Sequence, residues 1–221
     1  MHRRLTGKSD IAQRMQKIAT RWQGRPYIPD SLIGGPDLQE KLVVNLRAFD
    51  CVTFVESVLA LARSRSTRGF LGELKSIRYR GGQIDWFSRL HYFSDWMKSN
   101  HARGTVRIRT RGAGSRSIEA RLSLLDDLPP RRCRFHVVPK RKLHQARRRI
   151  ENGSVIGFAS VRSRLDFFHT GLLFIQDDQL LLFHASRSAK KVVAEPLAGF
   201  LQRNRMRGIA FAAPRDAGES R

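Results

Sequence analysis

Residues 166–186 read DFFHTGLLFIQDDQLLLFHAS, two apolar runs separated by an Asp-Asp pair at 177–178. Apolar runs of this length on either side of a short polar turn predict an antiparallel β-hairpin. With the turn centred on the two aspartates, Ile175 pairs with Leu180. The stretch therefore predicts that the C-terminal part of the chain forms an antiparallel sheet.

Three polar side chains fall on one face of this hairpin. In the predicted register His169 faces Ser186, and His184 faces Gly171. Because side chains alternate along a strand, His169, His184 and Ser186 share a face, with the histidines about 5 to 8 Å apart as diagonal neighbours. Such a cluster is either a catalytic base with its orienting partner or a structural pair bonded to backbone. A metal site is a weaker alternative, because no third ligand is evident in the sequence.

The remaining segments place helices before strands. Apolar residues recur at helical spacing in three segments, Asp10–Trp22, NLRAFDCVTFVESVLALARS at 45–64, and Trp86–Lys98, which predicts three helices. A loop rich in Gly and Pro separates the first two. Short apolar runs predict further strands at 155–161, 190–195 and 208–213. We therefore predict an α+β fold in which N-terminal helices pack on a C-terminal antiparallel sheet.

The length and charge of the chain limit the number of domains and the kinds of partner that it can have. Its 221 residues predict a single domain at 10–213, flanked by a basic tail at 1–9 and a C-terminal tail at 214–221. Lys and Arg number 42 against 19 Asp and Glu, and many lie in an insertion-like segment at 104–149. This excess favours anionic partners. Because no helix-turn-helix, zinc-finger or basic-aromatic strand signature accompanies it, an envelope polymer or lipid is favoured over nucleic acid.

The cysteines point to chemistry at one position. Cys51 and Cys133 lie in different contexts, so no disulfide framework is predicted, and no Cys or His spacing indicates a metal. Asp50 is placed to cap the helix that Cys51 opens, and the helix dipole is expected to lower the pKa of the Cys51 thiol. A nucleophile and a small core residue both fit this position. A helix-capping cysteine followed by His169 on a strand is, however, a papain-like order of parts.

Five short stretches carry a family resemblance. They are Pro26-Tyr27, FDCVTFVE at 49–56, RLHYFSDW at 89–96, HTG at 169–171 and HAS at 184–186. As an ordered set over roughly residues 10–213, they resemble the NlpC-type papain-like cell-wall cysteine peptidases, and within them the N-acetylmuramoyl-L-alanine amidase-like family, a former domain of unknown function. Two features depart from that family: Gly153-Ser154 replaces its usual Gly-Asp, and the basic segment is hard to align.

The resemblance implies roles for individual residues. Cys51 is the expected nucleophile, His169 the general base and His184 the third member, a place that Ser186 also fits. Tyr27 is expected to line the pocket and help bind the oxyanion, or only to cover the helix end. Substrate binding or pocket support is expected from a second group: Asp50, Arg89, His91, Tyr92, Asp95 and Ser186. Arg89 either holds a carboxylate in a bidentate fork or forms a surface salt bridge. No cofactor is expected.

The expected activity is hydrolysis of the N-acetylmuramoyl-L-alanine amide bond in bacterial muropeptides, including 1,6-anhydro forms. A stem-peptide endopeptidase of the same fold and a non-catalytic polyanion-binding module are the alternatives, and delivery into rival cells as a toxin ranks below a housekeeping role. No apolar run approaches the roughly 18 residues of a membrane span. The basic start also lacks the apolar stretch of about 7 to 15 residues of a secretory signal. The envelope is favoured over the cytoplasm as its location.

Overall fold

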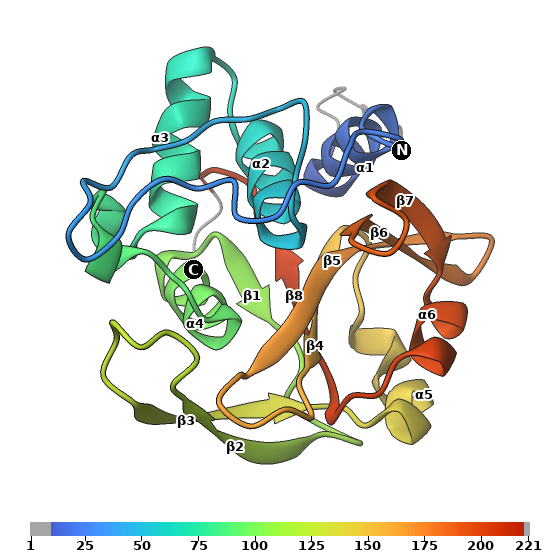
Figure 1. Cartoon of the computed structure of the whole chain (residues 1–221). Helices are drawn as coiled ribbons and strands as arrows, with labels where there is room; N and C mark the ends of the chain where they lie inside the picture. The colour runs from blue at the N-terminus through green and yellow to red at the C-terminus, as the bar shows by residue number, and fades with distance from the viewer. Residues whose placement is uncertain (1–9, 219–221) are drawn as a thin grey trace.

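The computed structural model describes residues 10–218 of the protein, and the predicted basic tail at 1–9 lies outside this range. Four helices and one six-stranded sheet form most of the fold (Figure 1). The helices are α1 (Ile11–Arg21), α2 (Cys51–Arg63), α3 (Thr67–Arg78) and α4 (Phe93–Arg103). The strands run in the order β1-β8-β4-β5-β6-β7, with every pair antiparallel. The predicted α+β class is confirmed.

The six strands lie close to the predicted runs, except β1, for which no run was predicted. They are β1 (Val106–Ile108), β4 (Ser154–Ala159), β5 (Phe167–Gln176), β6 (Gln179–Ser186), β7 (Lys191–Pro196) and β8 (Gly208–Pro214). Ile175 pairs with Leu180, as predicted, and the β5–β6 ladder runs from the turn as far as Leu172 and Phe183. The pairing of His169 with Ser186 expected from this register lies beyond that ladder.

Each face of the sheet is covered by helices. Val155 and Leu172 belong to the apolar core shared with α1 to α4. Their neighbours Ile156 and Leu173 point the other way, into a second core with Phe200 of α6 (Leu197–Arg203) and Ala146 of α5 (Leu143–Ala146). Because both faces of β4 and β5 are covered, these strands read as nearly continuous apolar runs. The packing of the N-terminal helices on the sheet is therefore as predicted, and α6 is an addition.

Helix α2 brings the N-terminal half of the chain against the sheet. Phe54, Val58 and Leu59 are completely buried, and the helix packs against α1, α3 and β5. Its start faces β5, as the central position of α2 in Figure 1 shows. The first residue of α2, Cys51, is thereby placed beside the strand that carries His169.

The prediction for the third helix was wrong in its bounds. Residues Trp86–Ser88 form a separate 3-10 turn, because the side chain of Asp85 accepts hydrogen bonds from the Phe87 and Ser88 N–H groups. The chain is then extended at Arg89, and α4 begins only at Phe93. Helix α3 was not predicted. Short 3-10 turns complete the helical elements at Arg80–Gly82, Lys140–Lys142 and Arg147–Arg149.

The basic segment at 104–149 is more ordered than its sequence pattern indicates. Strand β1 adds an edge to the main sheet, whereas β2 (Arg116–Leu122) and β3 (Arg131–Val137) pair as a separate two-stranded ribbon. One face of the ribbon is buried, and the exposed face carries Arg121, Arg132 and Arg134. Arg121 lies directly opposite Arg132, an arrangement of like charges that is unfavourable without a counter-charge.

Among the described residues, each helix is too short or too polar to cross a lipid bilayer.

Candidate active site

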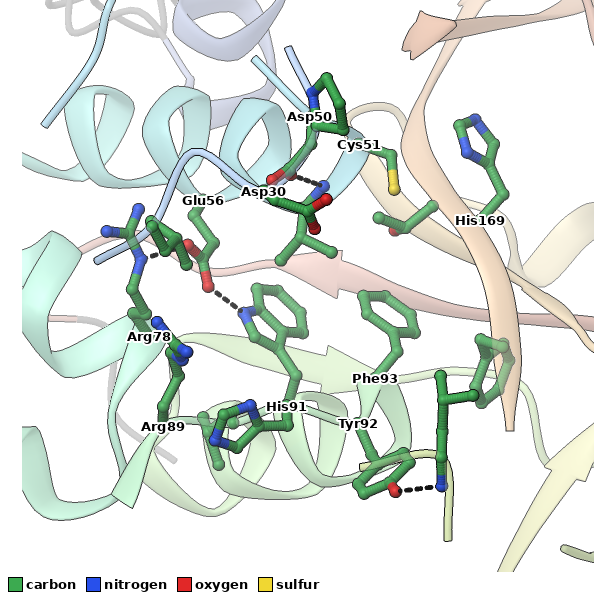
Figure 2. Close-up of a pocket in the computed structure, with 18 of the residues that line it drawn as sticks. Asp30, Asp50, Cys51, Glu56, Arg78, Arg89, His91, Tyr92, Phe93 and His169 are labelled. Atoms are coloured by element: carbon green, nitrogen blue, oxygen red, sulfur yellow. Dashed lines mark hydrogen bonds and ion pairs between the residues drawn. The ribbon is translucent and has the colours of Figure 1, made fainter. Parts of the chain in front are cut away.

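A cleft of about 600 Å³ lies between the start of α2, the start of β5 and the segment before α4 (Figure 2). This volume falls in the range of small-molecule sites. Segments far apart in the chain line it: residues 27–34, 50–52, 86–93, 124–125 and 165–170, with the side chains of Glu56, Arg78, Trp96 and Arg187. Cys51 and His169, predicted from separate stretches of sequence, therefore meet in one cavity.

Cys51 is held in place by a capping box at the start of α2. The Asp50 carboxylate accepts hydrogen bonds from the Val52 N–H at 2.8 Å and the Thr53 N–H at 2.7 Å. The Thr53 hydroxyl in turn accepts one from the Asp50 N–H at 3.0 Å. The predicted cap is confirmed, and it fixes the direction in which the Cys51 side chain leaves the helix. In Figure 2 the sulfur lies on the side of α2 toward His169.

The helix end lowers the pKa of the Cys51 thiol, as expected, but the net shift is upward. Burial raises this pKa to about 12, and the negative charge of Asp50 adds to the effect. Backbone hydrogen bonds from Thr170, Cys51 and Val52 oppose the shift without overcoming it. The thiolate is thus disfavoured in this environment because desolvation outweighs the helix-end donors. Cys51 rests as a neutral thiol.

His169 is the first member of a hydrogen-bonded chain. Its Nε2 lies 2.7 Å from Nδ1 of His184, and its ring stacks on those of Phe158 and Phe200 at centroid distances of 5.9 and 5.5 Å. Burial, reinforced by His184, lowers the pKa of His169 to about 3. Burial also lowers the pKa of His184. Both imidazoles are therefore neutral near pH 7.

Ser186 is placed elsewhere than the hairpin pattern predicts. Its hydroxyl lies 3.1 Å from that of Ser188 and accepts a hydrogen bond from the Ala189 N–H at 3.2 Å. These contacts belong to the turn between β6 and β7. The structure thus brings His184, and not Ser186, into contact with His169.

Tyr27 lies in a loop tied to the start of α2. Its N–H donates to the Lys190 carbonyl at 2.9 Å, and the following Ile28 N–H donates to the Phe49 carbonyl at 3.0 Å. The side chain is half-buried and lines the cleft beside Cys51. Burial, followed by the charge of Cys51, raises the pKa of the phenol. Tyr27 is consequently a neutral hydroxyl donor next to the predicted nucleophile.

Arg89 and His91 build one wall of the cleft around Trp86. The Arg89 guanidinium pairs with Glu40 at 3.0 Å and lies over the Trp86 ring, 4.3 Å from its centroid. His91 Nε2 lies 2.8 Å from the Trp86 carbonyl. The side chain of Arg89 is only 11% exposed. One arm of the expected carboxylate fork is therefore already occupied by a buried ion pair.

Tyr92 lines the cleft, and Asp95 lies behind it. The Tyr92 hydroxyl accepts hydrogen bonds from the Leu124 N–H at 2.9 Å and the Leu125 N–H at 3.4 Å, so it holds a loop that lines the cleft. Asp95 forms an ion pair with Arg131 of β3 and is not among the lining residues. Both positions suit the predicted support of the pocket.

Two acidic groups near the site were not predicted from the sequence. Glu56 and Arg78, 2% and 3% exposed, pair at 2.7 Å at the floor of the cleft, and Trp96 donates to the same carboxylate at 3.2 Å. In the sequence, Glu56 is marked only by being a lone carboxylate within the apolar face of α2. The second group is Glu195 of β7, whose Oε1 lies 3.0 Å from Nε2 of His184. Glu195 could have been found from the pairing of β7 with β6, which places Glu195 diagonally across from His184.

Within residues 10–218, no group of three or more His, Cys, Asp or Glu side chains is arranged to hold a metal ion.

Comparison with known proteins places the chain in a family. A family model described as N-acetylmuramoyl-L-alanine amidase-like matches residues 17–209. A crystal structure of an N-acetylmuramoyl-L-alanine amidase from Bacteroides uniformis is 29% identical, with a TM-score of 0.83 over 94% of this chain and 100% of that one. A Legionella pneumophila protein, 22% identical, shares the fold with a TM-score of 0.81 over 93% of this chain and 89% of its own. The search of curated proteins found no match. The chain belongs to the N-acetylmuramoyl-L-alanine amidase-like family of enzymes.

Proposed function

We propose that the protein is a cysteine amidase of the NlpC type that hydrolyses the bond between the muramic acid lactyl group and L-alanine in muropeptides, including 1,6-anhydro forms. The observation that carries the proposal is the meeting of Cys51 and His169 in one cleft, with His184 behind the base. The family and the amidase from Bacteroides uniformis support the same bond type. Peptidoglycan fragments in the bacterial envelope are the substrate we expect.

Because Cys51 and His169 are both neutral at rest, the first step must include a proton transfer between them. Because His169 Nε2 is engaged by His184, its Nδ1 is the nitrogen left to face Cys51. As the sulfur attacks the amide carbonyl, the thiol proton passes to Nδ1, so thiolate character develops during the attack. Asp50 occupies the Val52 and Thr53 N–H groups. We therefore assign the Cys51 N–H and the Tyr27 hydroxyl to the oxyanion.

The second half of the reaction restores the enzyme. Protonated His169 gives its proton to the departing amine, the carbon–nitrogen bond breaks, and a thioester joins Cys51 to the muramyl group. Water then attacks the thioester carbonyl while His169 accepts its proton, and the proton returns to sulfur as the carbon–sulfur bond breaks. The reaction consumes one water and needs no group beyond these side chains.

We assign the substrate's free carboxylate to Arg187 and not to Arg89. Arg89 is committed to Glu40, which leaves it a supporting role in the wall. Arg187 is exposed, lines the cleft and acts electrostatically on Tyr27. A guanidinium beside the nucleophile suits a stem peptide that ends in carboxylates.

We also propose that the outer face of the β2–β3 ribbon binds an anionic envelope polymer that carries phosphate groups. Arg132 and Arg134, with side chains 83% and 75% exposed, share the single carboxylate of Glu119. The outer face also carries Ser117, Arg121 and His136 and no apolar residue. Guanidinium groups form strong paired hydrogen bonds with phosphate. A face without apolar side chains cannot insert into lipid, so a soluble polymer is the better fit.

The experiment is mass spectrometry of defined muropeptides, with and without the 1,6-anhydro sugar, after incubation with the protein. Cys51→Ala tests the nucleophile, and Cys133→Ala is the matched control, because that cysteine is buried against Ser94 away from the cleft. Release of free stem peptide by the wild type and the control alone supports the amidase. Cleavage within the peptide indicates an endopeptidase, and no cleavage by any protein leaves a polyanion-binding module.

A further inference from the structure

The hydrogen-bonded chain from His169 continues beyond His184. Oε1 of Glu195 lies 3.0 Å from Nε2 of His184, and Oε2 of Glu195 is paired with Arg203 of α6. The His184 side chain is 2% exposed and the Glu195 side chain 22%. Three strands and a helix thus supply four consecutive members of one chain of contacts.

The sheet register explains why Glu195 reaches this position. His184 pairs with Val193, and Leu182 pairs with Glu195. Because side chains alternate along each strand, Glu195 projects from the same face as His184 as its diagonal neighbour. Arg203 then approaches from α6, which packs against β6 and β7. The contact is built into the fold and does not depend on a flexible loop.

The chemistry of these groups fixes the protons between them. An ionised carboxylate only accepts hydrogen bonds, so Nε2 of His184 must carry a proton and Nδ1 must offer its lone pair. Nδ1 of His184 therefore accepts the hydrogen bond from Nε2 of His169. A neutral His169 with its proton on Nε2 has a free lone pair on Nδ1, which is the form that can take a proton from Cys51.

We propose that Glu195 is a positioning residue that sets the tautomers of His184 and His169, and thereby holds His169 ready to act as a base. The inference rests on the proposed cysteine mechanism and adds a fourth member to it. Glu195 takes no proton during the reaction. Its carboxylate remains paired with Arg203, and the only proton transferred in the attack goes from Cys51 to Nδ1 of His169.

Glu195→Gln tests this directly, because the two side chains have nearly the same shape. Arg203 can only donate hydrogen bonds, so the amide oxygen faces Arg203 and the amide NH2 faces Nε2 of His184, to which it donates. His184 then carries its proton on Nδ1 and donates to Nε2 of His169, which forces the His169 proton onto Nδ1. We expect kcat to fall by a factor on the order of 10² to 10⁴, as expected when a base is held in the wrong tautomer, with KM little changed.

The control is Arg203→Gln, which removes the ion pair but keeps the carboxylate on His184. It should retain most of the activity. Nitrogen-15 NMR of the histidine rings supplies a readout that a merely structural role does not move: His169 should change from the Nε2–H to the Nδ1–H form in Glu195→Gln only. Thermal unfolding checks that both variants fold.

The outcomes separate the two proposals. If Cys51→Ala is inactive while Glu195→Gln keeps full kcat and the wild-type tautomers, the role of Glu195 is overturned and the cysteine mechanism stands. Activity retained by Cys51→Ala would overturn the mechanism itself. An equal loss of activity in Glu195→Gln and Arg203→Gln, without a tautomer change, would also contradict the inference, since it would point to the ion pair as structural support.

Discussion

Asp50 caps the helix that begins at Cys51 and, from the same position, opposes ionisation of the Cys51 thiol. Its carboxylate accepts hydrogen bonds from the Val52 and Thr53 N–H groups at 2.8 and 2.7 Å, which fixes the start of the helix. Its own negative charge raises the pKa of the thiol further. The residue that orients the proposed nucleophile therefore also favours its neutral form.

Asp50→Asn should separate these two effects. An amide oxygen still accepts the two N–H hydrogen bonds, so the helix start is kept at a cost within about 1 kcal/mol of stability. The charge that raises the pKa of Cys51 is removed, so alkylation by iodoacetamide at pH 8 should become faster. Asp37→Asn, an exposed loop change of equal charge, is the control. An unchanged or slower rate in Asp50→Asn alone would contradict the assignment.

The neutral resting pair predicts a particular pH dependence of alkylation. Because the pKa of Cys51 is raised to about 12, the thiolate fraction should rise about tenfold for each pH unit below that value. The alkylation rate, measured in a Cys133→Ala background, should therefore climb steadily between neutral and alkaline pH. A preformed thiolate–imidazolium pair would instead give a rate nearly independent of pH, and that result would refute the neutral resting state.

Gly171 allows the two histidines to meet. A Cβ atom at this position would lie 2.8 Å from the Phe183 carbonyl oxygen and 3.1 Å from Cβ of His184. Gly171→Ala should push β6 away from β5 and lengthen the His169–His184 contact. We expect a loss of kcat of about tenfold or more and a lower free energy of unfolding, measured by muropeptide turnover and urea denaturation. Gly72→Ala, where a Cβ meets open space, serves as the control.

Arg187→Gln should weaken substrate binding without slowing the chemical step. We expect KM to rise about fivefold or more and kcat to change little, the result of removing an interaction made equally in ground and transition states. The check is a muropeptide whose stem carboxylates are amidated. It should bind equally weakly to the wild type and the variant. A similar loss with the amidated substrate would mean that Arg187 contacts another group.

The β2–β3 ribbon should account for binding to phosphate polymers. Replacing Arg121, Arg132 and Arg134 together by Ser should weaken binding to inorganic polyphosphate at least about tenfold, with an affinity that falls as salt rises. The control replaces Arg65, Arg68 and Arg80, exposed residues around α3 at the opposite end of the view in Figure 1. Equal losses in both triple variants would contradict a specific face. Tighter binding to phosphatidylglycerol vesicles or to DNA would change the class of partner.

The sequence predicted those parts of the fold that depend on local patterns. The hairpin register, the capping of α2 by Asp50 and the proximity of His169 and His184 as diagonal neighbours all follow from periodicity and turn position. Strand β1 is only three residues long. It pairs with β8, the last strand in the chain, so no local pattern marks it. The acidity of Cys51 was mispredicted because burial depends on the loop and strand that cover α2, which the helix alone does not reveal.

The neutral resting state of Cys51 also bears on how the protein withstands oxidants. Peroxide attacks thiolates and largely spares thiols, so a resting thiol should be oxidised slowly. Cys133 is a free cysteine outside the cleft, so it offers Cys51 no neighbouring thiol to reverse such damage through a disulfide. We expect an enzyme whose nucleophile is created only during attack to give up some speed and gain a longer working life in oxidising surroundings.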